Sequence, residues 1–129
     1  MRRYRPAMIR FRWLPAVALP ALLVVGGCGT GSDDLVRRTA EEFTAAVASG
    51  DVERACGLLT ERAREDVECE SLDVPGGTVR AVEVWGDAAQ VHTSDDVLFL
   101  RELASGWRVA GAGCESQGER PYTCEVGGP

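Results

Sequence analysis

Residues 47–59, VASGDVERACGLL, place a Gly-Asp pair between two stretches whose apolar residues have helical spacing. Glycine adopts the left-handed conformation that ends many helices, and aspartate is a preferred N-cap. The pair therefore predicts that one helix stops at Gly50 and that a second begins after Asp51. The buried face of the second helix is expected to carry Val52, Ala55, Cys56 and Leu59.

The segment before this junction has the pattern of a longer amphipathic helix over residues 33–48. Ser32 is a suitable N-cap, and Asp33 and Asp34 suit the positive end of the helix dipole. Apolar residues recur at intervals that place them on one side of the helix, namely Val36, Ala40, Phe43 and Val47. We expect this stripe to face the core.

Downstream of the junction, the sequence predicts a short third helix and then a loop. Thr60 is a suitable N-cap for a turn or two in which Ala63 and Val67 point inward. Residues 71–77 end in Pro-Gly-Gly, which is typical of a loop. This loop is expected to separate a helical half from a strand half.

The hydrophobic pattern changes after residue 77. Segments rich in Val, Thr, Phe and Trp are separated by pairs typical of turns, Gly86-Asp87, Asp95-Asp96 and Ser105-Gly106. The pattern predicts an antiparallel meander of four strands over residues 78–85, 88–94, 97–104 and 107–112. Residues 113–129 are expected to form a loop. Helices followed by a meander predict an α+β domain, with N-terminal helices packed on a curved antiparallel sheet of about four strands.

Several stretches resemble a known kind of domain. Residues 47–59 resemble the helix–Gly-Asp–helix junction of domains similar to nuclear transport factor 2, a cone-shaped fold also called cystatin-like. WGDAAQV (85–91), GWRV (106–109) and the Gly-Cys and RPYTC segments within 113–124 resemble parts of small exported bacterial lipoproteins with such a domain. The resemblance covers about residues 22–127. It implies a cone-like fold and no particular chemistry.

Residues 1–27 have the order of charge, apolar run and small residues that is typical of a secretory signal peptide. The apolar run, residues 13–25, is shorter than the ~20 residues that a spanning helix needs. VGGC (25–28) resembles a bacterial lipobox, in which the cysteine receives diacylglycerol and becomes the first mature residue. We therefore expect lipidation at Cys28. An ordinary secretory cleavage near Gly27 is the alternative.

The expected organisation is a lipoprotein signal peptide over 1–27, a lipidated tether over 28–32 and a single domain over 33–129. All 20 acidic residues but only nine of the 14 arginines follow Gly27, so the mature chain has a net charge of −11. Such a chain is repelled by nucleic acid and by anionic headgroups. The expected membrane partner is the lipid bilayer on the extracytoplasmic face, reached through acyl chains on Cys28.

Four cysteines remain after Cys28, an even number that suits disulfides in an exported protein. They allow three pairings. We favour Cys56–Cys69 and Cys114–Cys124, because the members of each pair lie close together in sequence. A zinc site is disfavoured, since there is no C-x-x-C motif and the single histidine lies far from any cysteine cluster.

The candidate functional residues are few. Glu83 and His92 are the best candidates for a catalytic base in a cone pocket, but their alternation with apolar neighbours favours a solvent-facing position. The aromatic residues Trp85, Trp107 and Tyr122 are candidates for a binding surface, although large aromatic residues in a domain this small more often pack in the core. No catalytic residue, metal or cofactor is predicted.

The sequence favours a membrane-anchored, non-catalytic binding or accessory module of the cell envelope, with an envelope protein or a small ligand as its partner. The alternatives are an isomerase-like or cyclase-like enzyme that uses the cone pocket, and a purely structural envelope protein. A polar cavity containing Glu83 or His92 would favour the enzyme. A filled apolar core with an exposed aromatic surface would favour binding.

Overall fold

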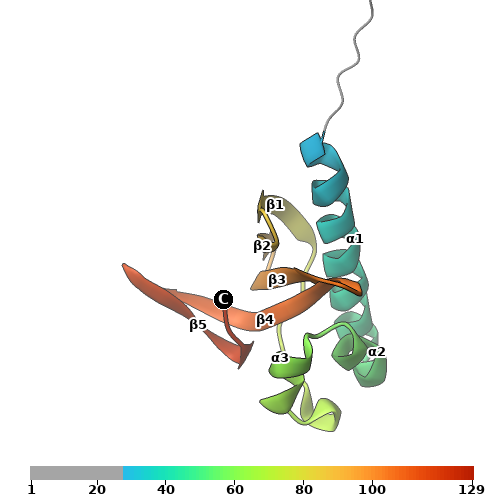
Figure 1. Ribbon diagram of the computed structural model, residues 1–129. Helices are drawn as coiled ribbons and strands as arrows, with labels where there is room; N and C mark the ends of the chain where they lie inside the picture. The colour runs from blue at the N-terminus through green and yellow to red at the C-terminus, as the bar shows by residue number, and fades with distance from the viewer. Residues whose placement is uncertain (1–27) are drawn as a thin grey trace, which may run out of the picture.

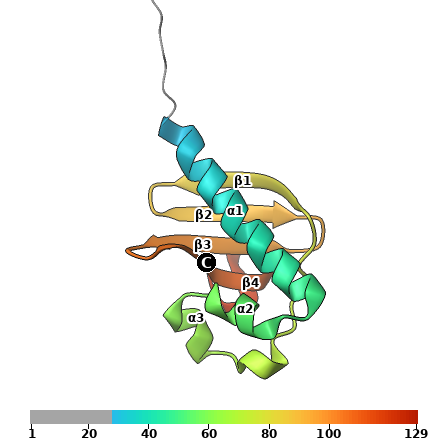
Figure 2. The ribbon, with the colours of Figure 1, turned by 90° about the vertical axis from the view of Figure 1, so that its right-hand side faces the viewer.

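The computed structural model describes residues 28–129, so the expected signal peptide lies outside the described residues. The fold is α+β, as predicted (Figure 1). The elements in order are α1 (Cys28–Ser49), α2 (Val52–Gly57), α3 (Glu61–Glu65), the 3-10 turn η1 (Cys69–Ser71), β1 (Val79–Trp85), β2 (Ala88–Thr93), β3 (Val97–Leu103), β4 (Gly106–Gln117) and β5 (Arg120–Gly127). The strands form one antiparallel sheet in the order β1-β2-β3-β4-β5, and α1 crosses one face of it (Figure 2).

The junction between α1 and α2 confirms the prediction made from the Gly-Asp pair. Gly50 has a φ of 76°, and its N–H donates to the Val47 carbonyl. The Asp51 N–H donates to the Ala46 carbonyl at 2.9 Å. These two bonds form the Schellman arrangement that satisfies the last carbonyls of a helix. The Asp51 side chain then accepts from the Arg54 N–H and caps α2.

Helix α1 begins at Cys28 rather than near Asp33, so the sequence prediction of its start was wrong. Ser32 lies inside the helix, and residues 28–32 continue it instead of forming a tether. Extending an existing helix costs far less than nucleating a new one. The packed stripe further along α1 therefore allows even this glycine-containing segment to be helical.

The core fills the space between α1 and the sheet. Phe43 and Val36 from α1 are fully buried, as are Val91 from β2 and Leu98 from β3. The segment of the short helices covers the core beside β4, where Leu59 forms a parallel bridge with Val109. A disulfide joins Cys56 on α2 to Cys69 on η1, which is the pairing favoured from the sequence.

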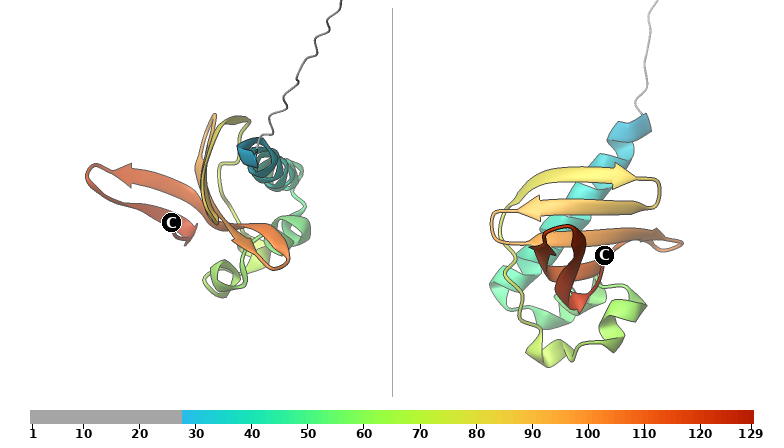
Figure 3. Two further views of the ribbon diagram at one scale, coloured as in Figure 1. Left: turned by 45° about the horizontal axis from the view of Figure 1, so that its top comes forward. Right: turned by 90° about the vertical axis from the view of Figure 1, so that its left-hand side faces the viewer.

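The tail is the main departure from the predicted fold. Residues 113–129 were expected to be a loop, but β4 continues to Gln117 and a fifth strand returns beside it. Phe99 pairs with Gly111 while Leu100 pairs with Val109, so β4 has a bulge at Ala110. Bulges bend a strand and increase its twist. Beyond this bend, the β4–β5 hairpin projects outward from the sheet, on the side that does not carry α1 (Figure 3).

Candidate functional site

The projecting part of the hairpin, residues 113–125, is called the arm. Its base is closed by the disulfide Cys114–Cys124, the second pairing favoured from the sequence. The two cysteines face each other directly in the register of β4 and β5. Glycine at 111 leaves room for this arrangement, since a Cβ there would lie 3.2 Å from Cys124 Sγ and 2.7 Å from the Gly128 carbonyl oxygen. The disulfide is therefore packed directly against the backbone of the sheet.

A buried carboxylate fastens the same base from the β2–β3 turn. Asp96 Oδ1 accepts from the N–H groups of Val97 at 2.7 Å and Cys114 at 3.1 Å. Its Oδ2 accepts from the Gly113 N–H at 2.9 Å. The φ of 66° at Gly113 is in the left-handed region that favours glycine. Three backbone donors on two segments of the chain thus converge on one side chain.

The electrostatic state of Asp96 follows from two opposing effects. Burial raises the pKa of its carboxyl above the ordinary value of 3.8, and the nearby negative charge of Asp95 adds to the rise. The hydrogen bonds from the backbone of Gly113, Val97 and Cys114 lower the pKa, but less than burial raises it. The hydrogen bonds to the Asp96 carboxylate all come from backbone N–H groups, and two of the three donors belong to the arm, so its role here is to fasten the arm.

Tyr122 connects the arm to the outer face of the sheet, the face opposite α1. Its ring meets Phe99 of β3 edge-on, with 5.2 Å between the ring centres. The Gln90 side-chain amide of β2 donates to the Tyr122 hydroxyl at 3.4 Å. The predicted binding residue Tyr122 is thus half-buried at the corner between the arm and the sheet.

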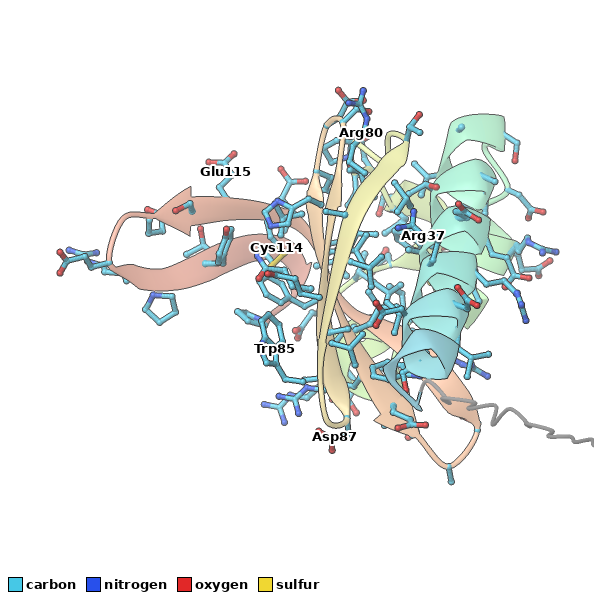
Figure 4. The ribbon with its side chains drawn as sticks, turned by 90° about the horizontal axis from the view of Figure 1, so that it is seen from above. Arg37, Arg80, Trp85, Asp87, Cys114 and Glu115 are labelled. Carbon is cyan, nitrogen blue, oxygen red and sulfur yellow. A yellow bond between two sulfur atoms is a disulfide. The ribbon has the colours of Figure 1, made fainter. Side chains whose placement is uncertain are left out.

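The other two aromatic candidates are not brought together with Tyr122. Trp107 is 3% exposed and belongs to the core, which agrees with core packing and removes it from the candidates for a binding surface. Its Nε1 is buried and has no hydrogen-bond partner among residues 28–129. Trp85 is 56% exposed at the end of β1. Figure 4 shows it on the same side of the sheet as Cys114, while Arg37 of α1 lies on the other side.

The candidates for a catalytic base lie on strands β1 and β2. Glu83 is exposed, and His92 is partly exposed beside buried Val91. The volume between α1 and the sheet is filled by apolar side chains. The two best-formed cavities of the described part of the chain contain neither Glu83 nor His92. Neither of these two cavities therefore brings together the residues that the sequence singled out for acid–base chemistry.

The larger cavity is an open groove of about 570 Å³ between α3 and the ends of β3 and β5. Two arginines and three carboxylates line it, namely Arg62, Arg101, Asp66, Asp87 and Glu102. Arg101 Nη1 lies 3.9 Å from Asp87 Oδ1 across the groove wall. The lining of the groove thus carries charges of both signs, with one more carboxylate than arginine.

Comparison of the chain with protein-family models, curated proteins and solved structures finds no match. Within residues 28–129, no helix is both long and apolar enough to cross a bilayer. The same part of the chain has no cluster of three or more histidine, cysteine or acidic side chains arranged to hold a metal ion. The likeness to nuclear-transport-factor-2-like domains therefore stays a prediction.

Sequence reasoning missed both the arm and the residue that fastens it. Asp96 was interpreted with Asp95 as a turn signal, and only the turn was recognised. The available signal for the arm was Gly118, which lies between two polar segments and has a φ of 71° at the hairpin turn. The charged residues of the groove gave no sequence signal, because they come from three separate segments of the chain.

Proposed function

We propose that this chain is a lipid-anchored binding or accessory module on the extracytoplasmic face of the cell membrane, and that the arm is its recognition element. The anchor is supported by the lipobox-like residues 25–28 and by the signal-peptide pattern before them. The oxidation of the four cysteines after Cys28 fits an exported protein. The nuclear-transport-factor-2-like, cone-shaped character of the domain belongs to the same proposal.

The observation that carries the proposal is that the fold fastens a polar ribbon that contributes little to the core. Residues 115–121 are all exposed, and a two-stranded hairpin alone is only marginally stable in water. The disulfide, the Asp96 carboxylate and Tyr122 nevertheless hold the arm in one position. A binding element that is already ordered loses less conformational entropy when a partner docks.

The charge of the arm indicates the kind of partner. Three carboxylates, Glu115, Glu119 and Glu125, are exposed along it, against a single cation, Arg120. An acidic, solvent-exposed element attracts a basic surface, and the attraction weakens as salt screens it. We therefore propose a basic envelope protein as the partner.

The anchor is tested by replacing Cys28, which removes the only proposed acylation site. Cys28→Ala is expected to be released from the membrane fraction or to remain unprocessed, whereas the parent sediments with membranes. Mass spectrometry of the parent should show diacylglycerol on Cys28. A variant that is matured and retained like the parent would contradict the anchor.

The recognition element is tested by capturing partners from native membranes with the acylated protein. The arm variant Glu115→Arg with Glu119→Arg is expected to lose a salt-sensitive partner that the parent captures. The matched control, Glu61→Arg with Glu65→Arg, makes the same change of charge on exposed positions of α3 and should keep that partner. Equal loss in both variants would indicate a general charge effect and would remove the arm from the proposal.

A further inference from the structure

Residues 28–129 have three large apolar side chains that are strongly exposed. They are Leu35 at 46%, Trp85 at 56% and Leu103 at 43%. Single exposed apolar residues are common on soluble domains and need no special explanation. The position of these three residues relative to one another is the informative feature.

All three lie toward one end of the molecule. Trp85 is the last residue of β1 and Leu103 the last residue of β3. Because alternate strands of an antiparallel meander run in the same direction, β1 and β3 end at the same edge of the sheet. Helix α1 also begins on this side, beside the β1–β2 turn (Figure 2). Figure 4 agrees, since Trp85 and Asp87 lie toward the end where the chain enters α1, away from Arg80.

We propose that this end of the molecule, called the anchor end, rests against the lipid surface, with Trp85 in the membrane interface. The inference rests on the proposed acylation of Cys28. Helix α1 begins at Cys28 itself, so no flexible spacer separates the acylated residue from the domain. Leu35 follows seven residues later, about 10 Å along the helix axis, and a tilted helix brings it close to the headgroup layer.

The side-chain chemistry of the anchor end suits a bilayer interface. Tryptophan is enriched where one part of the ring can be apolar and its N–H remains hydrated. Asp87 beside it lies 3.9 Å from the guanidinium of Arg101, which partly offsets its repulsion from lipid phosphates. The rest of the chain is strongly acidic, so we expect the contact to be closer on zwitterionic than on anionic lipid.

The test uses tryptophan fluorescence of the acylated mature protein in phosphatidylcholine vesicles. The proposed mature protein contains only Trp85 and Trp107, because Trp13 lies within the proposed signal peptide. Phosphatidylcholine with brominated acyl chains quenches nearby tryptophans. We expect quenching of the parent and its loss in Trp85→Phe, because Trp107 is buried in the core. Replacing part of the phosphatidylcholine by phosphatidylglycerol should weaken the quenching at low salt.

The control moves the fluorophore along the same strand. Trp85→Phe with Arg80→Trp places a tryptophan near the other end of β1, at another exposed position, where brominated lipid should not quench it. Equal quenching at both positions, or none at Trp85 in a protein whose Cys28 is shown by mass spectrometry to be acylated, would overturn the proposed orientation alone. An unmodified Cys28 would overturn the anchor and the orientation together.

Discussion

The body, which is the part of the sheet covered by the helices, is continuous with the arm through strands β4 and β5, but different interactions stabilise the two regions. In the first half of β4, Trp107, Val109 and Ala112 are buried in the core. Further along the same strand, every residue from Glu115 onward is exposed. The body is thus stabilised mainly by apolar burial. The arm depends on a disulfide, a buried carboxylate and one aromatic contact at its base.

This difference shows that a hairpin can extend beyond the hydrophobic core only where other interactions stabilise it in place of apolar burial. A hairpin with no apolar layer cannot offset the conformational entropy of its backbone. The disulfide reduces the entropy of the unfolded chain, and Asp96 satisfies N–H groups that the bend in β4 removes from the ladder. The body and the arm should therefore respond differently to substitutions.

The largest effect is expected in the body. Phe43→Ala removes a fully buried aromatic ring and should lower the free energy of unfolding by about 3–5 kcal/mol. Chemical denaturation measures this loss. Leu35→Ala on the exposed side of the same helix is the control and should change stability by less than about 0.5 kcal/mol. Similar losses in both variants would mean that α1 does not form the core described here.

The next largest effect tests whether the arm is separately stabilised. Cys114→Ala with Cys124→Ala opens a loop with a sequence separation of 10, which corresponds to about 2–3 kcal/mol in the chain-entropy model. We expect amide hydrogen exchange to accelerate mainly in the arm. Cys56→Ala with Cys69→Ala, which opens a loop of 13 within the body, should accelerate exchange in α2 instead. Identical exchange patterns for the two variants would abolish the distinction between body and arm.

A smaller effect is expected from the carboxylate that links the two regions. Asp96→Ala leaves the buried N–H groups of Gly113 and Cys114 without their acceptor, at a cost of about 2 kcal/mol. Asp95→Ala, at the exposed neighbouring position, is the control and should be nearly neutral. An equal loss of stability in the two variants would show that Asp96 does not fasten the arm.

The same variant has a predicted pH dependence. The pKa of Asp96 is raised in the folded state by burial, so folding favours the protonated carboxyl. The corresponding stabilisation is present below the ordinary carboxyl pKa and is lost as the pH rises through the raised value. The stability difference between the parent and Asp96→Ala should therefore be larger in acid than at neutral pH. The opposite slope would contradict the raised pKa.

The smallest effect is expected on the outer face of the sheet. His92→Ala removes a partly exposed side chain and should change the free energy of unfolding by less than about 0.5 kcal/mol. Capture of the partner should be unchanged. Val91→Ala, one position away and fully buried, should be clearly more damaging. If His92→Ala melts like the parent but loses the function of the protein, the histidine has a chemical or recognition role, and the enzyme hypothesis replaces ours.

The sequence predicted those features that local patterns determine. The Gly-Asp junction, the Thr60 cap of α3, the stripe on α1 and the first four strands each depend on neighbouring residues. The arm was missed because its strands have no buried face, so they lack the alternation that identifies a strand. Asp96 was missed as a fastening residue because its partners, Gly113 and Cys114, lie 17 and 18 positions away. The sequence pattern around Trp107 did not distinguish it from Trp85, and only the tertiary packing shows that Trp107 is buried and Trp85 is exposed.

The strand order has a consequence for how this chain acquires its structure. Every strand pairs with its neighbour in sequence, and each disulfide joins consecutive cysteines among the four that remain after Cys28. A chain that crosses a membrane from its N-terminus can therefore complete each hairpin and each disulfide as soon as the second partner emerges. Low contact order of this kind favours rapid folding. If Cys28 is acylated as proposed, an oxidant that joins the remaining cysteines in order of appearance would produce the native pairs without a reshuffling step.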